Sequence, residues 1–147
     1  MKRSVAALAG AFFCAAALTV ARASGTVHIM QPDGTQQSYS DVSIKILHNA
    51  LYLTTANGKG TLVINRAACS YQGEILVCLP TGVTLVQGGN ATPLNLTTGT
   101  VYLNLTKETQ PLALSSAQLP PRSLMMSFST KRGTFVGLTG QIDEVVK

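Results

Sequence analysis

Tryptophan is absent from this sequence, and both aromatic residues (5%) and charged residues (12%) are scarce. The scarcity of aromatic residues argues against a barrel in a membrane, because such barrels carry aromatic girdles at both bilayer surfaces. The scarcity of charge argues against nucleic-acid binding, which needs a basic surface that matches the phosphate backbone. We therefore expect neither a membrane barrel nor a nucleic-acid partner.

Groups that could perform catalysis are also few. The sequence contains only two histidines, His28 and His48, and neither a G-x-S-x-G nor an H-E-x-x-H motif. The cysteines and histidines do not have the spacing of a zinc site. The sequence thus predicts no catalytic residue, no metal ligand and no cofactor. A small hydrolase remains an alternative, in which one histidine meets a serine and a carboxylate contributed by other strands.

The N-terminus has the three parts of a secretory signal peptide. Lys2 and Arg3 precede an alanine-rich apolar run that ends at Ala21-Arg22-Ala23, which is an A-x-A cleavage site. The run is too short for a membrane-spanning helix, which needs about 20 apolar residues. We predict a signal peptide over residues 1–23 and one exported domain over residues 24–147, which is not integral to a membrane after cleavage.

Cleavage after Ala23 changes both the charge and the cysteine count. The formal net charge of +5 falls to +2, because Lys2, Arg3 and Arg22 leave with the leader. Cys14 also leaves, so the exported chain keeps an even number of cysteines. We expect a periplasmic or extracellular location, where disulfides persist.

Beyond the leader, apolar residues alternate with polar ones and do not recur at helical spacing. In the segment 41–47 (DVSIKIL), Val42, Ile44 and Ile46 face one way and the residues between them face the other. About eight to ten short strands of this kind are separated by turn residues. The pattern predicts an all-β antiparallel sandwich or small barrel with little or no helix.

The strongest hairpin signal lies at Asn57-Gly58, between two alternating runs. Both residues tolerate the positive φ that a two-residue type I′ turn requires. This turn pairs Leu53 with Leu62 on one face and Tyr52 with Val63 on the other. Because both strands then agree on the apolar face, the register is well defined.

A second hairpin holds the two remaining cysteines in the segment 69–78 (CSYQGEILVC). A two-residue loop at Gly73-Glu74 suits a type II′ turn and pairs Cys69 directly with Cys78. Cα atoms in such a non-hydrogen-bonded pair are about 4.5 Å apart, within the range that a disulfide accepts. A rival loop one residue earlier pairs Cys69 with Leu76 and fits a disulfide less well.

One group of basic residues is a possible binding surface. Arg122, Lys131 and Arg132 flank or join the last two predicted strands and could gather at one end of that hairpin. The simpler interpretation is solubilising charge at a hairpin tip. A surface rich in Thr, Ser, Asn and Gln favours contact with a protein or a polysaccharide, although composition alone is a weak guide to function.

We therefore expect an exported, non-enzymatic β-domain that acts as a binding or envelope-structural module; the sequence does not define its oligomeric state. One alternative is the hydrolase described above. Another is an inhibitor of an external hydrolase, which would use a projecting loop at Gln87–Pro93 or at the tip 131–133. Three Asn-x-Thr triplets begin at Asn90, Asn95 and Asn104, and the sequence assigns them no role.

The paired cysteines generate the first prediction. Protein purified from its native compartment should not react with a thiol-alkylating reagent until it has been reduced, because Cys69 and Cys78 are bonded to each other. Mass spectrometry before and after reduction measures this directly. Two alkylated thiols in the unreduced protein would contradict the predicted hairpin register.

Overall fold

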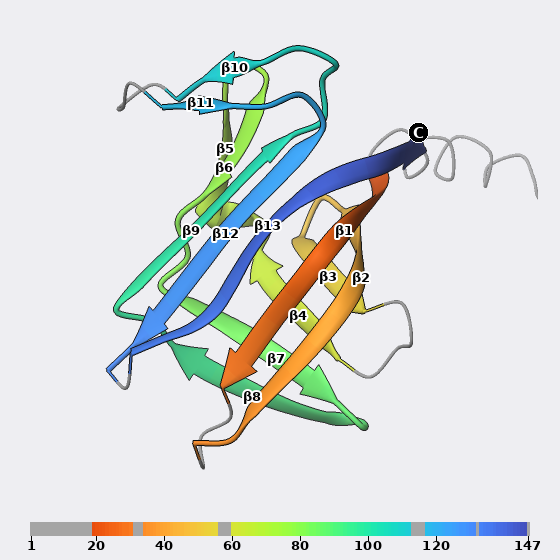
Figure 1. Cartoon of the computed structure of the whole chain (residues 1–147). Coiled ribbons are helices and arrows are strands. Elements are labelled where there is room, and N and C mark those ends of the chain that lie inside the picture. The colour runs from red at the N-terminus through yellow and green to blue at the C-terminus, as the bar shows by residue number, and fades with distance from the viewer. Residues whose placement is uncertain (1–18, 31–33, 56–59, 113–116, 132, 147) are drawn as a thin grey trace, which may run out of the picture.

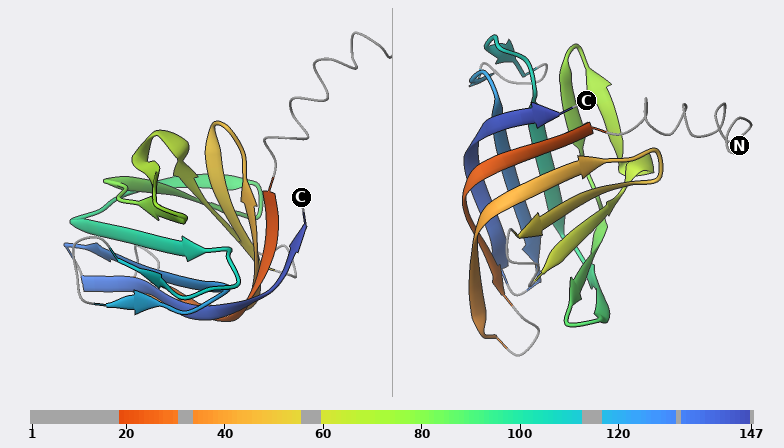
Figure 2. Two further views of the ribbon diagram at one scale, coloured as in Figure 1. Left: turned by 90° about the horizontal axis from the view of Figure 1, so that it is seen from above. Right: turned by 90° about the vertical axis from the view of Figure 1, so that its right-hand side faces the viewer.

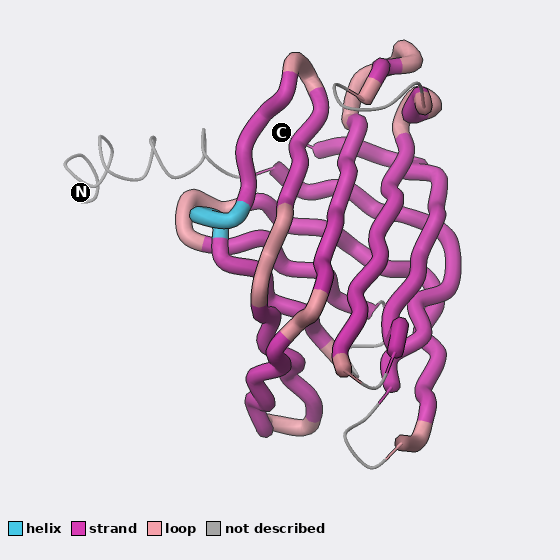
Figure 3. The backbone as a smooth tube through the Cα atoms, turned by 90° about the vertical axis from the view of Figure 1, so that its left-hand side faces the viewer, coloured by secondary structure: helices cyan, strands magenta, loops and turns pink. Residues whose placement is uncertain are grey.

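The computed structural model describes residues 19–30, 34–55, 60–112, 117–131 and 133–146. Within these ranges the chain consists almost entirely of antiparallel strands, as the sequence predicts (Figure 1). The helical segment there is a single 3₁₀ turn, η1, drawn in cyan in Figure 3. No helix of the described ranges is therefore long and apolar enough to cross a membrane.

The described residues form thirteen strands, of which eleven make one sheet in the order β5-β6-β9-β12-β13-β1-β2-β3-β4-β7-β8. The other two, β10 and β11, pair with each other. The bounds are β1 Thr19–Met30, β2 Gln36–Ile46, β3 Ala50–Thr55, β4 Thr61–Asn65, η1 Arg66–Ala68, β5 Cys69–Gln72, β6 Ile75–Cys78, β7 Gly82–Gln87, β8 Asn90–Asn95, β9 Thr98–Asn104, β10 Gln110–Pro111, β11 Gln118–Leu119, β12 Ser123–Thr130 and β13 Gly133–Val146.

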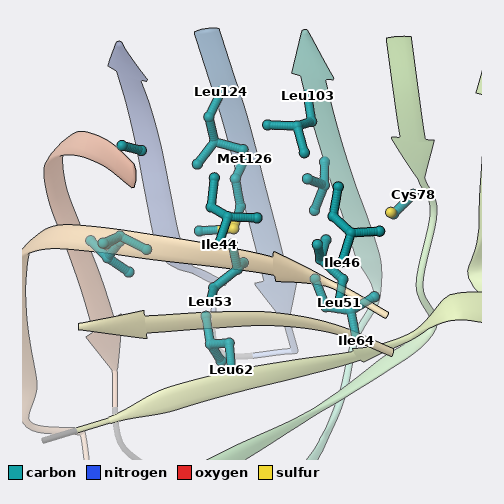
Figure 4. Close-up of a cluster of buried hydrophobic side chains, with 14 of the residues drawn as sticks. Ile44, Ile46, Leu51, Leu53, Leu62, Ile64, Cys78, Leu103, Leu124 and Met126 are labelled. Atoms are coloured by element: carbon teal, nitrogen blue, oxygen red, sulfur yellow. The ribbon is translucent and has the colours of Figure 1, made fainter. Parts of the chain in front are cut away.

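The eleven-stranded sheet curls over itself into a half-barrel (Figure 2). In Figure 4, strands β2, β3 and β4 cross over β9 and β12, and side chains from both layers point into a common interior. Alternate residues supply this interior, as the period of two along a strand requires. Ile44, Leu51, Leu103, Leu124 and Phe128 are fully buried in it. The predicted all-β antiparallel fold is confirmed, and it has more strands than the eight to ten that the sequence suggested.

The path of the chain brings its first and last described strands side by side in the sheet. Strands β1 to β4 pair in sequence, and β13 returns from the other end of the chain to pair with β1. Val20–Ala23 of β1 pairs with residues 142–146 of β13. β1 begins at Thr19, upstream of the cleavage site predicted after Ala23. The predicted boundary thus falls within a central strand.

The hairpin predicted around Asn57-Gly58 has the expected register. Leu53 pairs with Leu62, and Tyr52 pairs with Val63. The leucines are buried in the core, whereas Tyr52 and Val63 lie on the other face and are half-exposed. The turn itself lies outside the described residues. The pattern of alternation therefore predicted both the pairing and the faces.

Two segments differ from their predictions. The predicted loop at Gln87–Pro93 is a hairpin: β7 and β8 pair from Gln87 with Asn90 back to Gly82 with Asn95. Gly88 and Gly89 form its two-residue turn with φ values of 55° and 83°, which matches the type I′ pattern. The connection predicted between Lys107 and Arg122 contains the small β10–β11 hairpin.

The cysteine hairpin also follows the predicted register. Cys69 pairs with Cys78 across β5 and β6, and Gly73 has a φ of 64° at the turn. The two residues form a disulfide, with their Cα atoms 3.9 Å apart. Because β5 is an edge strand of the sheet, the bond fastens this four-residue strand to its only neighbour in the sheet.

Asn104 anchors the segment that carries β10 and β11. Its side chain is fully buried, and Nδ2 donates to the carbonyl oxygens of Glu108 at 2.8 Å, Pro120 at 2.9 Å and Leu119 at 3.4 Å. Its Oδ1 accepts from the backbone N–H of Thr106 at 2.9 Å. The Asn-Leu-Thr triplet at this position is therefore an Asx turn, and the amide that glycosylation would need is buried and engaged.

The buried amide generates the second prediction. Asn104→Asp keeps the shape of the side chain but replaces the donating amide with an oxygen that faces carbonyl oxygens. We expect the free energy of unfolding to fall by about 3 kcal/mol, because several buried acceptors lose their donor. Chemical denaturation measures the change.

The exposed Asn95→Asp is the matched control, and it should change stability by no more than about 0.5 kcal/mol. Equal effects of the two substitutions would show that the Asn104 contacts do not stabilise the fold.

Candidate functional site

Of the basic residues predicted as a binding surface, Arg122 and Lys131 lie at opposite ends of β12. Arg122 immediately precedes β12, and Lys131 immediately follows it. Because an extended strand rises about 3.3 Å per residue, the two Cα atoms are about 30 Å apart. Arg132 lies outside the described residues. The structure therefore separates Arg122 from Lys131, and no single basic cluster contains both.

Arg122 is part of the framework. Its φ is 49°, in the left-handed region that few residues other than glycine adopt. Its backbone N–H donates to the carbonyl oxygen of Thr106 at 2.9 Å, and its own carbonyl oxygen accepts from the N–H of Ile142 at 2.6 Å. These bonds hold the start of β12 between β13 and the segment that follows β9. A structural role accounts for its unusual conformation.

Among the described residues, neither histidine is part of the catalytic arrangement that a hydrolase would need. His28 is exposed, and its Nδ1 lies 2.8 Å from Oγ of Ser38 and 3.2 Å from Nε2 of Gln36. Among the described residues its hydrogen-bond partners include no carboxylate, so the third group of a triad is not in place. His48 lies exposed in the short turn between β2 and β3.

A metal centre has no candidate in the part of the chain that the structure describes. No group of three or more His, Cys, Asp or Glu side chains lies close enough to hold an ion there. Cys69 and Cys78 are occupied by their disulfide.

An open groove on the outer face of the sheet is a candidate binding site. It has a volume of about 430 Å³ and crosses β3, β4, β7 and β8. Tyr52, Val63, Thr84 and Pro93 line it, and each pairs with the next across neighbouring strands. They form one continuous row on the side away from the core. We call this the β4–β7 groove.

The groove arises where β4 and β7 part. Their ladder ends at the pair Val63 and Thr84, after which the chain of β4 turns into η1. The next position on β7 facing the groove is Gly82, which has no side chain to fill the space. Asn65 lines the groove on the β4 side, and its Oδ1 accepts from the N–H of Ala67 at 2.9 Å. This bond fixes the orientation of the amide.

The described residues that line the β4–β7 groove carry no charged side chain. Its polar side chains are Asn49, Asn65, Asn95, Thr84 and the phenol of Tyr52. Amide groups both donate and accept hydrogen bonds, and the Tyr ring adds an apolar surface with a polar tip. Such a lining suits a neutral ligand that is rich in hydroxyl groups.

Part of this site was accessible from the sequence. The hairpin register places Tyr52 beside Val63 on the outward face, and alternation places Thr84 outward on β7. The pairing of β4 with β7 was not predicted, because the β5–β6 hairpin separates these strands in the sequence and joins the opposite edge of the sheet. The groove depends on that pairing.

No protein-family model, no curated protein and no solved structure matches this chain. Functional interpretation therefore depends on the residues of the chain and on their geometry.

The environment of His28 generates the third prediction. Ser38 should not react with a fluorophosphonate probe, because the described residues supply no carboxylate that would orient His28 as a base. Peptide mass spectrometry after labelling locates any adduct. A known serine hydrolase labelled in parallel confirms that the probe is active. Labelling at Ser38 that disappears in His28→Gln would instead support the hydrolase alternative.

Proposed function

We propose that this chain is an exported, non-enzymatic binding domain that holds a neutral polysaccharide in the β4–β7 groove. The observation that carries the proposal is the row Tyr52-Val63-Thr84-Pro93, flanked by amide side chains and free of charged residues. Export is supported by the signal-peptide pattern and by the disulfide, which suits an oxidising compartment.

The shape of the groove suits a polymer better than a small molecule. A pocket for a small ligand usually buries most of the ligand surface, whereas this groove is an open furrow on the outside of a sheet. Four strands at about 4.8 Å spacing give it a length of about 14 Å across the row. A polysaccharide chain can lie along such a row and extend beyond it at both ends.

The chemistry of the lining favours a sugar polymer over a protein. Sugars present C–H faces that pack on an aromatic ring, and their hydroxyls exchange hydrogen bonds with amides such as those of Asn65 and Asn95. The central residues of protein interfaces usually include several large aromatic or Arg side chains. The groove has one aromatic residue, Tyr52, and no Arg.

The fourth prediction follows from Tyr52. On an array of neutral and anionic oligosaccharides, the protein should bind neutral ones, and Tyr52→Ala should weaken that binding at least tenfold. Loss of the ring removes packing worth about 1.4 kcal/mol, the equivalent of a tenfold change in Kd. Titration of the best oligosaccharide by calorimetry gives the two affinities.

Tyr71→Ala is the matched control, because Tyr71 is 56% exposed on β5, outside the groove. It should leave binding unchanged. A pull-down from envelope extract supplies the opposing test. The proposal would be contradicted if the protein bound no oligosaccharide and instead captured a protein partner that the Tyr52→Ala variant captured equally well.

A further inference from the structure

The first five residues of β1, 19–23, lie between two other strands. On one side Ala21 pairs with Ile44 and Ala23 with Val42, both in β2. On the other side the same stretch pairs with β13, with Ala23 opposite Ile142. The A-x-A site at Ala21–Ala23 forms the last three of these five residues. Cleavage after Ala23 would therefore remove all five with the leader.

The same residues belong to the hydrophobic core. Ala21 is 1% exposed and Ala23 is 0% exposed, in the same cluster as Val42, Ile44 and Ile142. Their small side chains suit a position where the curled sheet is crowded. A stretch that is discarded on export has no reason to alternate buried alanines with the half-exposed Val20 and the exposed Arg22, as a strand of this domain must.

Loss of residues 19–23 would open the sheet along the first half of β1, although Thr26–Met30 would still pair with β2. The ladder pairs of Val20–Ala23 with β13 on one side and with β2 on the other would be lost. The strands β2 and β13 would then stand two strand spacings apart, about 9.6 Å, which is too far for a hydrogen bond. The hydrogen bond from Ser24 Oγ to the carbonyl oxygen of Gln141, at 3.2 Å, would lie next to the gap. Residues 42–46 of β2 and 142–146 of β13 would lose the strand that lies between them.

The sequence offers a second cleavage motif upstream of the strand. Ala15-Ala16-Ala17 is also an A-x-A site, and Leu18 follows it directly before β1 begins at Thr19. The apolar stretch Val5–Cys14 before it has a length of about 10 residues, within the usual range for a leader. Cleavage after Ala17 removes the whole leader and leaves every residue of β1.

We propose that the signal peptidase of the exporting cell cleaves after Ala17, and that residues 18–23 remain as the first part of the folded domain. Water adds across the Ala17–Leu18 peptide bond, which leaves a carboxylate on the leader and an amine on Leu18. The exported chain then keeps Arg22, and its formal net charge becomes +3, since only Lys2 and Arg3 leave. This inference rests on the proposed export.

The fifth prediction is the N-terminal residue of the exported protein. Intact mass and N-terminal sequencing of the secreted or periplasmic fraction should find Leu18. Ala17→Leu places a large residue where the peptidase requires a small one, so the precursor should accumulate. Ala16→Leu makes the same change at the tolerated middle position and should be processed normally. Both substitutions lie outside β1, so neither alters the fold of the domain.

A wild-type protein that begins at Ser24, or an Ala17→Leu variant processed like the wild type, would overturn the inference while leaving export intact. An exported protein that keeps the whole leader would overturn it as well. Failure of export itself has a different signature: full-length chain in the cytoplasm, with reduced cysteines. Oligosaccharide binding is measured separately and depends on neither result.

Discussion

The junction between β1 and β13 holds the two halves of the curled sheet together. The partners come from opposite ends of the chain, as in Val20 with Val146. Contacts of such long range carry a large loop-closure cost and usually form after the local hairpins. We therefore expect the meander β1–β4 and the hairpins to form first and the junction to close last. The core beneath it, including Ala21, Ala23 and Ile142, is completed by the same step.

The open edges of the half-barrel are protected in different ways. β8 carries Pro93, which lacks the N–H that an added strand would need. At the other edge, β5 has only four residues and is fastened by the disulfide. With so few charges to keep molecules apart, these features limit edge-to-edge association. An open sheet can then expose an uncharged binding face without recruiting further copies through its edges.

Local features of the fold were predictable from the sequence, and distant ones were not. The Leu53–Leu62 and Cys69–Cys78 pairs were predicted because turn residues and alternation lie close together in the chain. The first four residues of β8, 90–93, were taken for part of a loop, since Pro93 and the preceding Gly88-Gly89 also suit a loop. The order of strands was not predictable: β4 joins β7 across an intervening hairpin, a choice made by core packing. For this reason the sequence indicated that Tyr52, Val63 and Thr84 face outward, but it did not predict the groove that they line.

The fully buried amide of Asn104 has a consequence for how the protein can be produced. Its triplet is a glycosylation acceptor while the chain is still extended, and its Nδ2 later makes three hydrogen bonds in the interior. A sugar attached there during secretion would be too large for this site and would prevent β10 and β11 from docking. The exposed triplets at Asn90 and Asn95 carry no such restriction. Expression through a glycosylating secretory route would therefore interfere with folding to the extent that Asn104 is modified before β10 and β11 dock.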